Sequence, residues 1–220
     1  MIVEEQKDKS DKLLLNILPK DTAEELKNKG SVRAQYYPDA TVLFTDVKGF
    51  SSISEKLAPE ELVKELDNCF SAFDQIVEKY NVEKIKTIGD AYMAVGGIPI
   101  NPVTHQEDVL KAAFEIKDYM LRVALEKQKT GQTFFEIRIG IHTGPLVAGV
   151  VGTKKFQYDV WGDTVNVASR MESNSEPGKV NISESVYQVI KSEKKYTFSP
   201  RGEIDVKGKG HMKMYFVDIN

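Results

Sequence analysis

The sequence of 220 residues contains one cysteine, one tryptophan and no long apolar run. A single cysteine, Cys69, cannot form an internal disulfide framework or a cysteine-rich zinc site, and its rarity is typical of a reducing compartment. No segment approaches the roughly 18 consecutive apolar residues that a membrane span requires. We therefore expect a soluble, cytoplasmic chain that makes no membrane contact itself, or the cytoplasmic part of a membrane-anchored protein.

An excess of positive charge is also missing. Lys and Arg number 30 against 33 Asp and Glu, which gives a formal net charge of −3. Without a basic field the chain has no means of attracting nucleic acid non-specifically, so a phosphate-bearing partner must be held by local cations. The basic, apolar and small-residue regions of a signal peptide are absent as well, because acidic and basic residues alternate from Glu4 to Lys12. We expect neither nucleic-acid binding nor secretion.

The size suits one large domain with a short appendage. Residues 1–35 are charged and helix-favouring, and Pro19 separates a first apolar face from a helix over 21–29 that ends at Gly30. That face consists of Leu13, Leu14, Ile17 and Leu18. Two interpretations stay open, a solvated appendage and a connector from an upstream sensor or regulatory domain, because one apolar heptad is too short to establish a coiled coil. Residues 36–220 form the predicted main domain.

Hydrophobic periodicity in this domain predicts the order strand, helix, hairpin, helix, strand. Amphipathic patterns indicate two long helices, over 59–80 and 106–127. The strands of this core are expected at residues 40–44, 82–86, 91–96 and 134–142. The order βαββαβ is that of a ferredoxin-like α+β sandwich. C-terminal additions are expected to comprise a turn at 143–145, a strand and helix within 159–171, a helix over 183–191 and a closing β pair.

Two aspartates lie at ends of these strands. Asp46 follows an apolar strand, and Asp90 lies at the tip of the hairpin over 82–96. If the strands pair in one sheet, the carboxylates can approach within the distance of metal ligands, and oxygen ligands without histidine or cysteine favour Mg²⁺ or Mn²⁺. Both aspartates also suit ordinary turns. The spacing leaves both interpretations open.

Phosphate-binding features accompany these aspartates. The small-residue turn at 48–52 can offer backbone N–H groups, including those of Gly49 and Phe50, to phosphate oxygens. Four cations lie beside apolar β runs, motif turns or glycines, namely Lys86, Arg138, Arg170 and Lys209. Each alone is more often a surface charge. The residues by themselves indicate a magnesium-dependent phosphate-binding domain and no more.

Four motifs in order carry a resemblance. They are VLFTDVKGFSS at 42–52, KIKTIGDAYMAVGGIP at 84–99, RIGIHTGPLVAGVVG at 138–152 and YDVWGDTVNVASRMES at 158–173. Together they resemble the class III nucleotidyl cyclase catalytic domain, and the similarity extends from about residue 40 to the C-terminus. NILPKDTAEEL at 16–26 resembles the connector that precedes this domain in many bacterial cyclases.

The resemblance implies a role for each matching position. Asp46 and Asp90 match the aspartates that bind two Mg²⁺ or Mn²⁺ ions, with the backbone carbonyl of Val47 as a further ligand. Arg138 and Lys209 match residues that contact the triphosphate of ATP. Asn166 matches the residue that orients the ribose, and Arg170 the residue that stabilises charge on the α-phosphate.

Two further positions are implied to select the purine. Lys86 can only donate, which suits N1 of adenine, and ionised Asp159 can only accept, which suits its 6-amino group, whereas guanine reverses both edges. Guanylyl cyclases resemble this chain but carry Glu and Cys there. The resemblance therefore implies an adenylyl cyclase that forms cyclic AMP and pyrophosphate.

The same resemblance implies a head-to-tail homodimer with two composite sites. Asp46, Asp90 and Arg138 of a site come from one copy, and the purine, ribose and α-phosphate residues with Lys209 come from the other. A guanylyl cyclase and a catalytically inactive cyclase-like module remain the alternatives. The presence of both aspartates, Asn166, Arg170 and the purine residues speaks against the inactive module.

Overall fold

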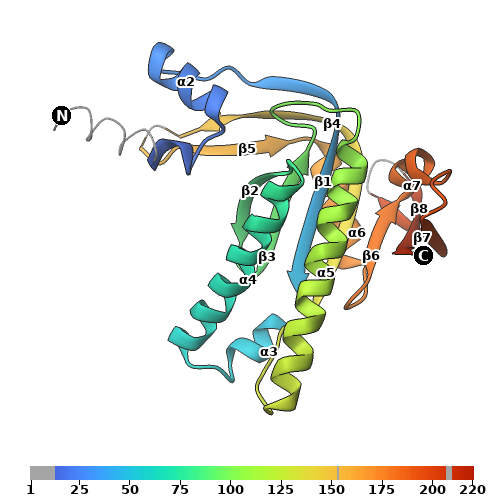
Figure 1. Ribbon diagram of the computed structural model, residues 1–220. Coiled ribbons are helices and arrows are strands. Elements are labelled where there is room, and N and C mark those ends of the chain that lie inside the picture. Colours follow the sequence, from blue (N-terminus) through green and yellow to red (C-terminus); the bar gives the residue numbers. More distant parts are fainter. Residues whose placement is uncertain (1–12, 153, 207–209) are drawn as a thin grey trace.

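The computed structural model describes residues 13–152, 154–206 and 210–220 (Figure 1). One mixed sheet of eight strands has the order β2-β3-β1-β4-β6-β8-β7, with β5 paired to β4 off this path. The strands are β1 (Gln35–Val47), β2 (Glu83–Ile88), β3 (Ala91–Gly96), β4 (Ile137–Val151), β5 (Gln157–Trp161), β6 (Val180–Ser183), β7 (Tyr196–Val206) and β8 (Gly210–Ile219). The helices are α2 (Lys20–Lys29), α3 (Phe50–Ser54), α4 (Pro59–Lys79), α5 (His105–Lys129), α6 (Asp163–Ser173) and α7 (Glu184–Ile190).

The predicted ferredoxin-like core is confirmed. Its four strands lie in the order β2-β3-β1-β4, and each neighbouring pair is antiparallel. The connections run β1-α4-β2-β3-α5-β4, and α4 and α5 lie together across one face of the sheet (Figure 1). This arrangement brings the C-terminal end of β1 next to the β2–β3 hairpin.

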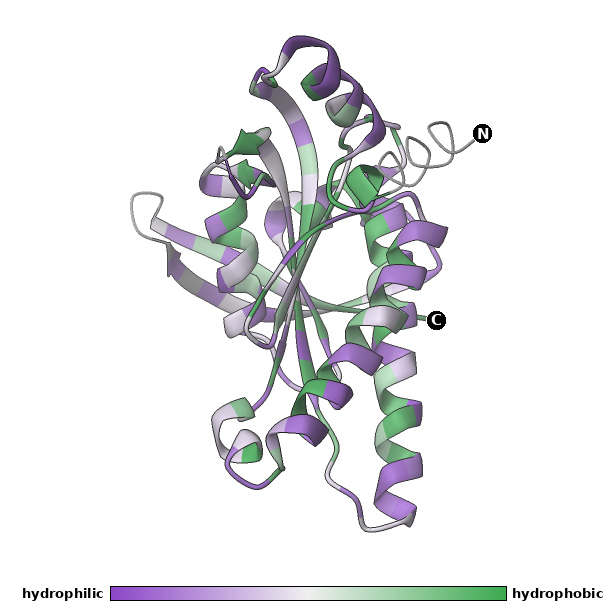
Figure 2. Cartoon of the chain, turned by 90° about the vertical axis from the view of Figure 1, so that its left-hand side faces the viewer, coloured by the Kyte–Doolittle hydropathy of each residue, from purple (hydrophilic) through white to green (hydrophobic). Residues whose placement is uncertain are grey.

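Amphipathic sequence explains how α4 and α5 cover the sheet. Pro59 begins α4, where its missing N–H costs no hydrogen bond. Hydrophobic and hydrophilic residues alternate around both helices (Figure 2), and the apolar sides join the larger of the two main core clusters. Cys69 lies on the buried side of α4, and burial raises the pKa of its thiol to about 11. The single cysteine is therefore a buried structural thiol.

The turn predicted at 143–145 is wrong. β4 continues through Gly144 and Pro145 as one strand of 15 residues that pairs with β1 on both sides of them. The register shifts between Tyr37 and Ala40 of β1, so β1 carries an extra residue opposite Pro145. A bulge of this kind interrupts the hydrogen-bond ladder where proline has no N–H to donate. Tertiary pairing thus overrides a local turn signal.

The C-terminal additions extend the sheet beyond β4. Strand β6 was not predicted; its four residues are all buried, and it pairs parallel to β4 and antiparallel to β8. A short strand without alternation gives little signal in a sequence. β7 and β8 form the predicted closing pair and are longer than expected.

The N-terminal segment packs against the second face of the sheet. Leu18 and Ala23 are buried in the core cluster that also contains Phe44 and Val42 of β1, whereas Ile17 is 59% exposed. Helix α2 ends at Gly30 in a left-handed conformation, as the sequence indicates. The boundary drawn at residue 35 stays a prediction. Within the described residues, no helix is both long and apolar enough to cross a membrane.

Candidate active site

The β2–β3 hairpin places Asp90 at its tip. β2 runs to Ile88, two residues further than predicted, so only Gly89 and Asp90 form the turn. Gly89 has φ +62°, a left-handed conformation that glycine adopts without steric cost. The tip therefore directs a half-buried carboxylate toward the end of β1.

Asp46 is next to this tip. Thr45 of β1 is paired with Tyr92 of β3, and Asp46 itself is paired with Arg138 of β4. Burial raises the pKa of Asp90 and the charge of Asp46 raises it further, while hydrogen bonds from the backbone of Asp90 and Val47 lower it. The two aspartates thus share one electrostatic environment, which the alternative of two unrelated turn residues does not explain.

A third carboxylate joins this group from helix α6. Nη2 of Arg138 lies 2.9 Å from Oδ1 of Asp46 and 2.9 Å from Oε1 of Glu172. Burial raises the pKa of Glu172 to about 7; Arg138 lowers it, and Asp46 and Asp90 raise it. We call Asp46, Asp90, Arg138 and Glu172 the acidic cluster. It contains three carboxyl groups and one guanidinium.

Sequence reasoning missed Glu172, although a signal existed. The buried residues of α6 recur at helical spacing, at Thr164, Val167, Ala168, Met171 and Glu172. A glutamate on the apolar stripe of an amphipathic helix needs a partner, because burial of an unpaired charge is costly. Arg138 provides that partner.

The acidic cluster fits a divalent cation. The described residues contain no group of three or more His, Cys, Asp or Glu side chains arranged to hold a metal ion. The expected ligands are instead two carboxylates and the backbone carbonyl of Val47, an oxygen-only set that suits Mg²⁺ or Mn²⁺. Burial, and after it the charge of Asp46, raises the pKa of Asp90, and a cation between the two carboxylates would favour their charged forms.

The turn after β1 leads into the short helix α3. Gly49 has φ +69°, and Phe50 packs its ring edge-on against Phe135, with centroids 6.2 Å apart. The backbone N–H of Lys48 already donates to the carbonyl of Glu136 at 2.7 Å. Phosphate contacts by Gly49 and Phe50 remain a prediction.

The two predicted purine-selecting residues form an ion pair within one chain. Nζ of Lys86, in β2, lies 2.6 Å from Oδ2 of Asp159, in β5. The other carboxylate oxygen, Oδ1, accepts the backbone N–H of Val160 at 2.9 Å. Their side chains are 27% and 10% exposed, so the pair is held firmly but can be reached from solvent. The structure therefore brings together two residues that are 73 positions apart.

Helix α6 presents the remaining predicted residues. Asn166 and Arg170 lie four positions apart, hence on one side of the helix, and both are exposed. Lys209 lies outside the described residues, between β7 and β8. Among the described residues, no hydrogen bond or ion pair joins the Lys86–Asp159 pair, Asn166 or Arg170 to Asp46, Asp90 or Arg138. One chain thus holds two separate groups.

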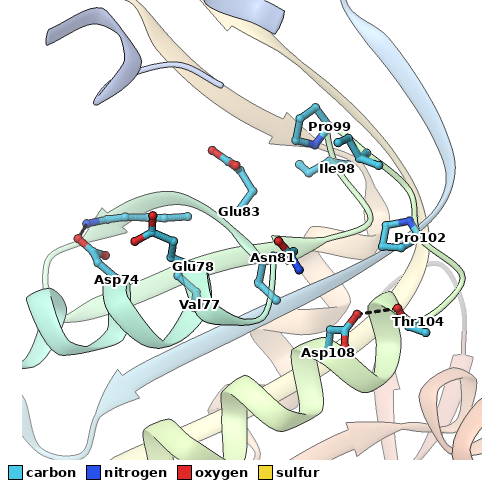
Figure 3. Close-up of a pocket in the computed structure, with 13 residues that line it drawn as sticks. Asp74, Val77, Glu78, Asn81, Glu83, Ile98, Pro99, Pro102, Thr104 and Asp108 are labelled. Carbon is cyan, nitrogen blue, oxygen red and sulfur yellow. Dashed lines mark hydrogen bonds and ion pairs between the residues drawn. The ribbon is translucent and has the colours of Figure 1, made fainter. Parts of the chain in front are cut away.

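A cavity in the described part of the chain lies away from these residues. It has a volume of about 620 Å³ and lies between the end of α4, the start of β2 and the loop from Ile98 to Thr104. Figure 3 shows Glu83, Asn81 and Pro99 around it. It contains no predicted site residue.

Comparison with known proteins identifies the motifs. The profile of the adenylate and guanylate cyclase catalytic domain matches residues 32–219. An adenylate cyclase of Mycobacterium tuberculosis is 41% identical over 217 residues, which are 98% of this chain and 48% of that protein. Guanylate cyclase soluble subunit beta-2 of Rattus norvegicus is 41% identical over 215 residues, 98% of this chain and 31% of that protein. The chain thus spans half or less of the length of these relatives.

A solved structure with the same fold is the adenylyl cyclase CyaB from P. aeruginosa. Its TM-score is 0.77 at 31% sequence identity, and the match covers 86% of this chain and 97% of that one. Adenylyl and guanylyl cyclases therefore both occur among the similar proteins. The choice between them depends on the residues that contact the base.

Proposed function

Because this chain belongs to the adenylate and guanylate cyclase catalytic domain family, we propose that it converts ATP to 3′,5′-cyclic AMP and pyrophosphate. The observation that carries the choice of ATP is the Lys86–Asp159 contact at 2.6 Å. It places a group that only donates next to a group that only accepts, at a position accessible to solvent. Adenine offers the complementary N1 acceptor and 6-amino donor side by side, and guanine offers the reverse.

The acidic cluster supplies the ligands of the proposed metal site. Asp46, Asp90 and the carbonyl of Val47 hold two divalent cations, either Mg²⁺ or Mn²⁺. Bound there, the cations lower the pKa of the ribose 3′-hydroxyl and neutralise the leaving pyrophosphate. Arg138 contacts the triphosphate from the neighbouring strand β4, with Gly49 and Phe50 offering backbone N–H groups at the turn.

The residues of α6 act at the other end of the substrate. Asn166 orients the ribose by hydrogen bonding, and Arg170 stabilises the charge that develops on the α-phosphate. Lys209 adds a further cation at the triphosphate. Positioning and charge stabilisation by fixed groups account for most of the rate enhancement in this scheme, and no protein nucleophile is required.

The proposed enzyme is a head-to-tail homodimer. Within the described chain no hydrogen bond or ion pair joins Lys86, Asp159, Asn166 or Arg170 to Asp46, Asp90 or Arg138, which supports a site formed by the acidic cluster of one copy and by the Lys86–Asp159 pair, Asn166 and Arg170 of another. Exposed apolar side chains near β5 support a covered surface, since Val151, Phe156 and Trp161 are 40–47% exposed. Such an arrangement gives two equivalent sites per dimer.

Mixing of two inactive variants tests the composite site. Asp46→Ala and Arg170→Ala chains are each expected to be inactive, and co-folding should produce heterodimers with one intact site. Random pairing then restores about a quarter of wild-type activity. The matched control is a mixture of Asp46→Ala with Asp90→Ala, whose defects lie in the same half and leave no intact site. Failure of the first mixture to regain activity would contradict the shared site.

Product analysis tests the reaction itself. The chain is incubated with Mn²⁺ and either ATP or GTP, and the nucleotides are separated. Cyclic AMP from ATP is the expected result. Cyclic GMP alone would overturn the choice of ATP, and the absence of any cyclic product would favour a catalytically inactive module.

The N-terminal segment is proposed to connect the domain to an upstream regulatory or sensor domain. Leu18 and Ala23 lie in one core cluster with Phe44, two residues before Asp46. A displacement of this segment therefore reaches the metal-binding strand through packed side chains. Cleavage of a longer parent protein before residue 13 should uncouple activity from its signal while basal activity remains, because Leu18 and Ala23 keep their place in the core.

A further inference from the structure

Arg138 is held from two sides by carboxylates of different elements. Asp46, its paired neighbour on β1, and Glu172, on α6, each place an oxygen 2.9 Å from Nη2. Nη1 is 3.4 Å from the carbonyl oxygen of Ser173. Nε is buried and has no hydrogen-bond partner among the described residues. The guanidinium is thus oriented mainly by charge.

The position of Glu172 is fixed by the backbone of α6. A Cβ added at Gly140, two residues after Arg138 on β4, would lie 1.9 Å from the backbone nitrogen of Glu172. The helix therefore touches the strand at this point, and only glycine permits the approach. The carbonyl of Met171 also accepts a hydrogen bond from Asn181 Nδ2 at 2.7 Å. Glu172 is 7% exposed, so it has little freedom to turn away.

The two carboxylates differ in what else they must do. Under the proposed function, Asp46 gives its charge to a cation, and its hold on Arg138 weakens at the time when the substrate binds. Glu172 is then the remaining carboxylate that contacts the guanidinium. An arginine without an anchor loses side-chain rotamer entropy when a phosphate immobilises it.

We propose that Glu172 is a positioning residue, which holds the Arg138 guanidinium toward the triphosphate and the pyrophosphate product while Asp46 is occupied by the metal. This inference rests on the proposed function and deepens it. Glu172 acts only through Arg138 and touches neither substrate nor metal. A role as a further metal ligand is the alternative outcome of the test.

The test measures binding of pyrophosphate in the presence of Mg²⁺ by calorimetry, together with the KM for ATP. Glu172→Gln keeps the shape of the side chain and removes its charge. We expect a pyrophosphate affinity about tenfold lower, as for loss of a buried ion-pair partner. KM should rise by a similar factor while kcat changes less. Glu176→Gln, at an exposed carboxylate that pairs with Arg201, is the matched control and should change neither value.

A double variant separates the positioning role from the alternatives. In an Arg138→Ala background, Glu172→Gln should have no further effect on pyrophosphate binding. An equal loss in that background, or weaker Mg²⁺ binding by Glu172→Gln alone, would overturn the proposal. If Glu172→Gln fails to fold, Glu172→Asp replaces it in the test. This variant withdraws the carboxylate by one methylene and should weaken pyrophosphate binding by an intermediate factor. Normal pyrophosphate binding by Glu172→Asp would also overturn the proposal.

The binding measurement also keeps the two proposals apart. Pyrophosphate binding requires no cyclisation, so a chain that binds it through Arg138 but forms no cyclic nucleotide would contradict the proposed function and leave the positioning role standing. If Glu172→Gln forms cyclic AMP as well as the wild type does, the positioning role is contradicted and the proposed function stands.

Discussion

Two groups of charged residues in the same chain are built on opposite electrostatic principles. The acidic cluster places three carboxyl groups around one guanidinium, and the pKa values of Asp90 and Glu172 are both raised. The Lys86–Asp159 pair matches one cation with one anion at 2.6 Å. The first group carries unbalanced charge, and the second is neutral as a whole.

The two groups are suited to bind different kinds of ligand. Crowded carboxylates are stabilised by any cation that enters between them, so the acidic cluster suits metal ions. A balanced pair gains nothing from an ion but offers a donor and an acceptor in fixed positions, which suits a neutral base that presents the complementary edge. The following predictions alter one group and ask whether the other responds.

The largest effect is expected from the acidic cluster. Asp90→Ala removes a proposed metal ligand and should lower turnover of ATP and of GTP by about 10³-fold or more. The measurement is the rate of cyclic nucleotide formation at saturating Mn²⁺. Asp118→Ala, at an exposed position on α5, serves as the control and should retain activity. Substantial turnover by Asp90→Ala would show that the cluster is not the metal site.

The second effect concerns only the Lys86–Asp159 pair. Lys86→Glu combined with Asp159→Cys should shift the ratio of kcat/KM values for GTP and ATP toward GTP by about 10²-fold or more, because both edges of the recognised base are reversed. Stabilisation by Mn²⁺, followed as a rise in Tm, should remain. Loss of that rise would mean that the two groups are not independent.

The third effect is a pH dependence of stability in EDTA. Because the pKa of Glu172 is raised from near 4.5 to about 7 in the folded chain, the folded state binds the proton more tightly than the unfolded one. This contribution is fully present below pH 4.5 and is lost as the pH rises through 7, by about 3 kcal/mol in the free energy of unfolding. Urea unfolding of wild type and Glu172→Gln between pH 5 and 8 measures it, since the variant lacks the contribution. Parallel curves would contradict the raised pKa.

The smallest effect is expected from relief of repulsion in the acidic cluster. Asp90→Asn removes one charge beside Asp46 and should stabilise the metal-free chain by about 1 kcal/mol. The same change should abolish the rise in Tm that Mg²⁺ produces in the wild type. A matched substitution in the balanced pair, Asp159→Asn, should instead destabilise the chain, because it leaves Lys86 without its partner. Equal signs for the two variants would remove the distinction between the groups.

Sequence patterns identified much of this architecture because local and tertiary preferences agree there. The hairpin tip at Asp90, the amphipathic helices and the order of the core follow from glycine placement and hydrophobic periodicity. At Gly144 and Pro145 the local and tertiary preferences disagree, since the local signal indicates a turn while pairing with β1 continues the strand around a bulge. Strand β6 is too short to show a period.

The residues of the candidate site also include some that the sequence indicates and one that it does not. The roles of the motif positions are predictions made from the sequence. Glu172, which connects Arg138 to α6, is not among them, because its partner is 34 residues away and the sequence marks it only as a charge on an apolar stripe. The contact at Gly140 that fixes this carboxylate depends on helix–strand packing, which no local pattern encodes. Long-range charge pairing is thus what the structure adds.

The contact between Lys86 and Asp159 also has an evolutionary consequence. Under the proposed function, a change of preference from ATP to GTP by single substitutions must pass through one of two intermediates. If Lys86→Glu comes first, two carboxylates lie where the ion pair now is, and one of them, Asp159, is only 10% exposed. Asp159→Cys first leaves a partly exposed lysine that water can solvate, at a smaller cost. Lineages that changed their preference from ATP to GTP should therefore have replaced the aspartate before the lysine.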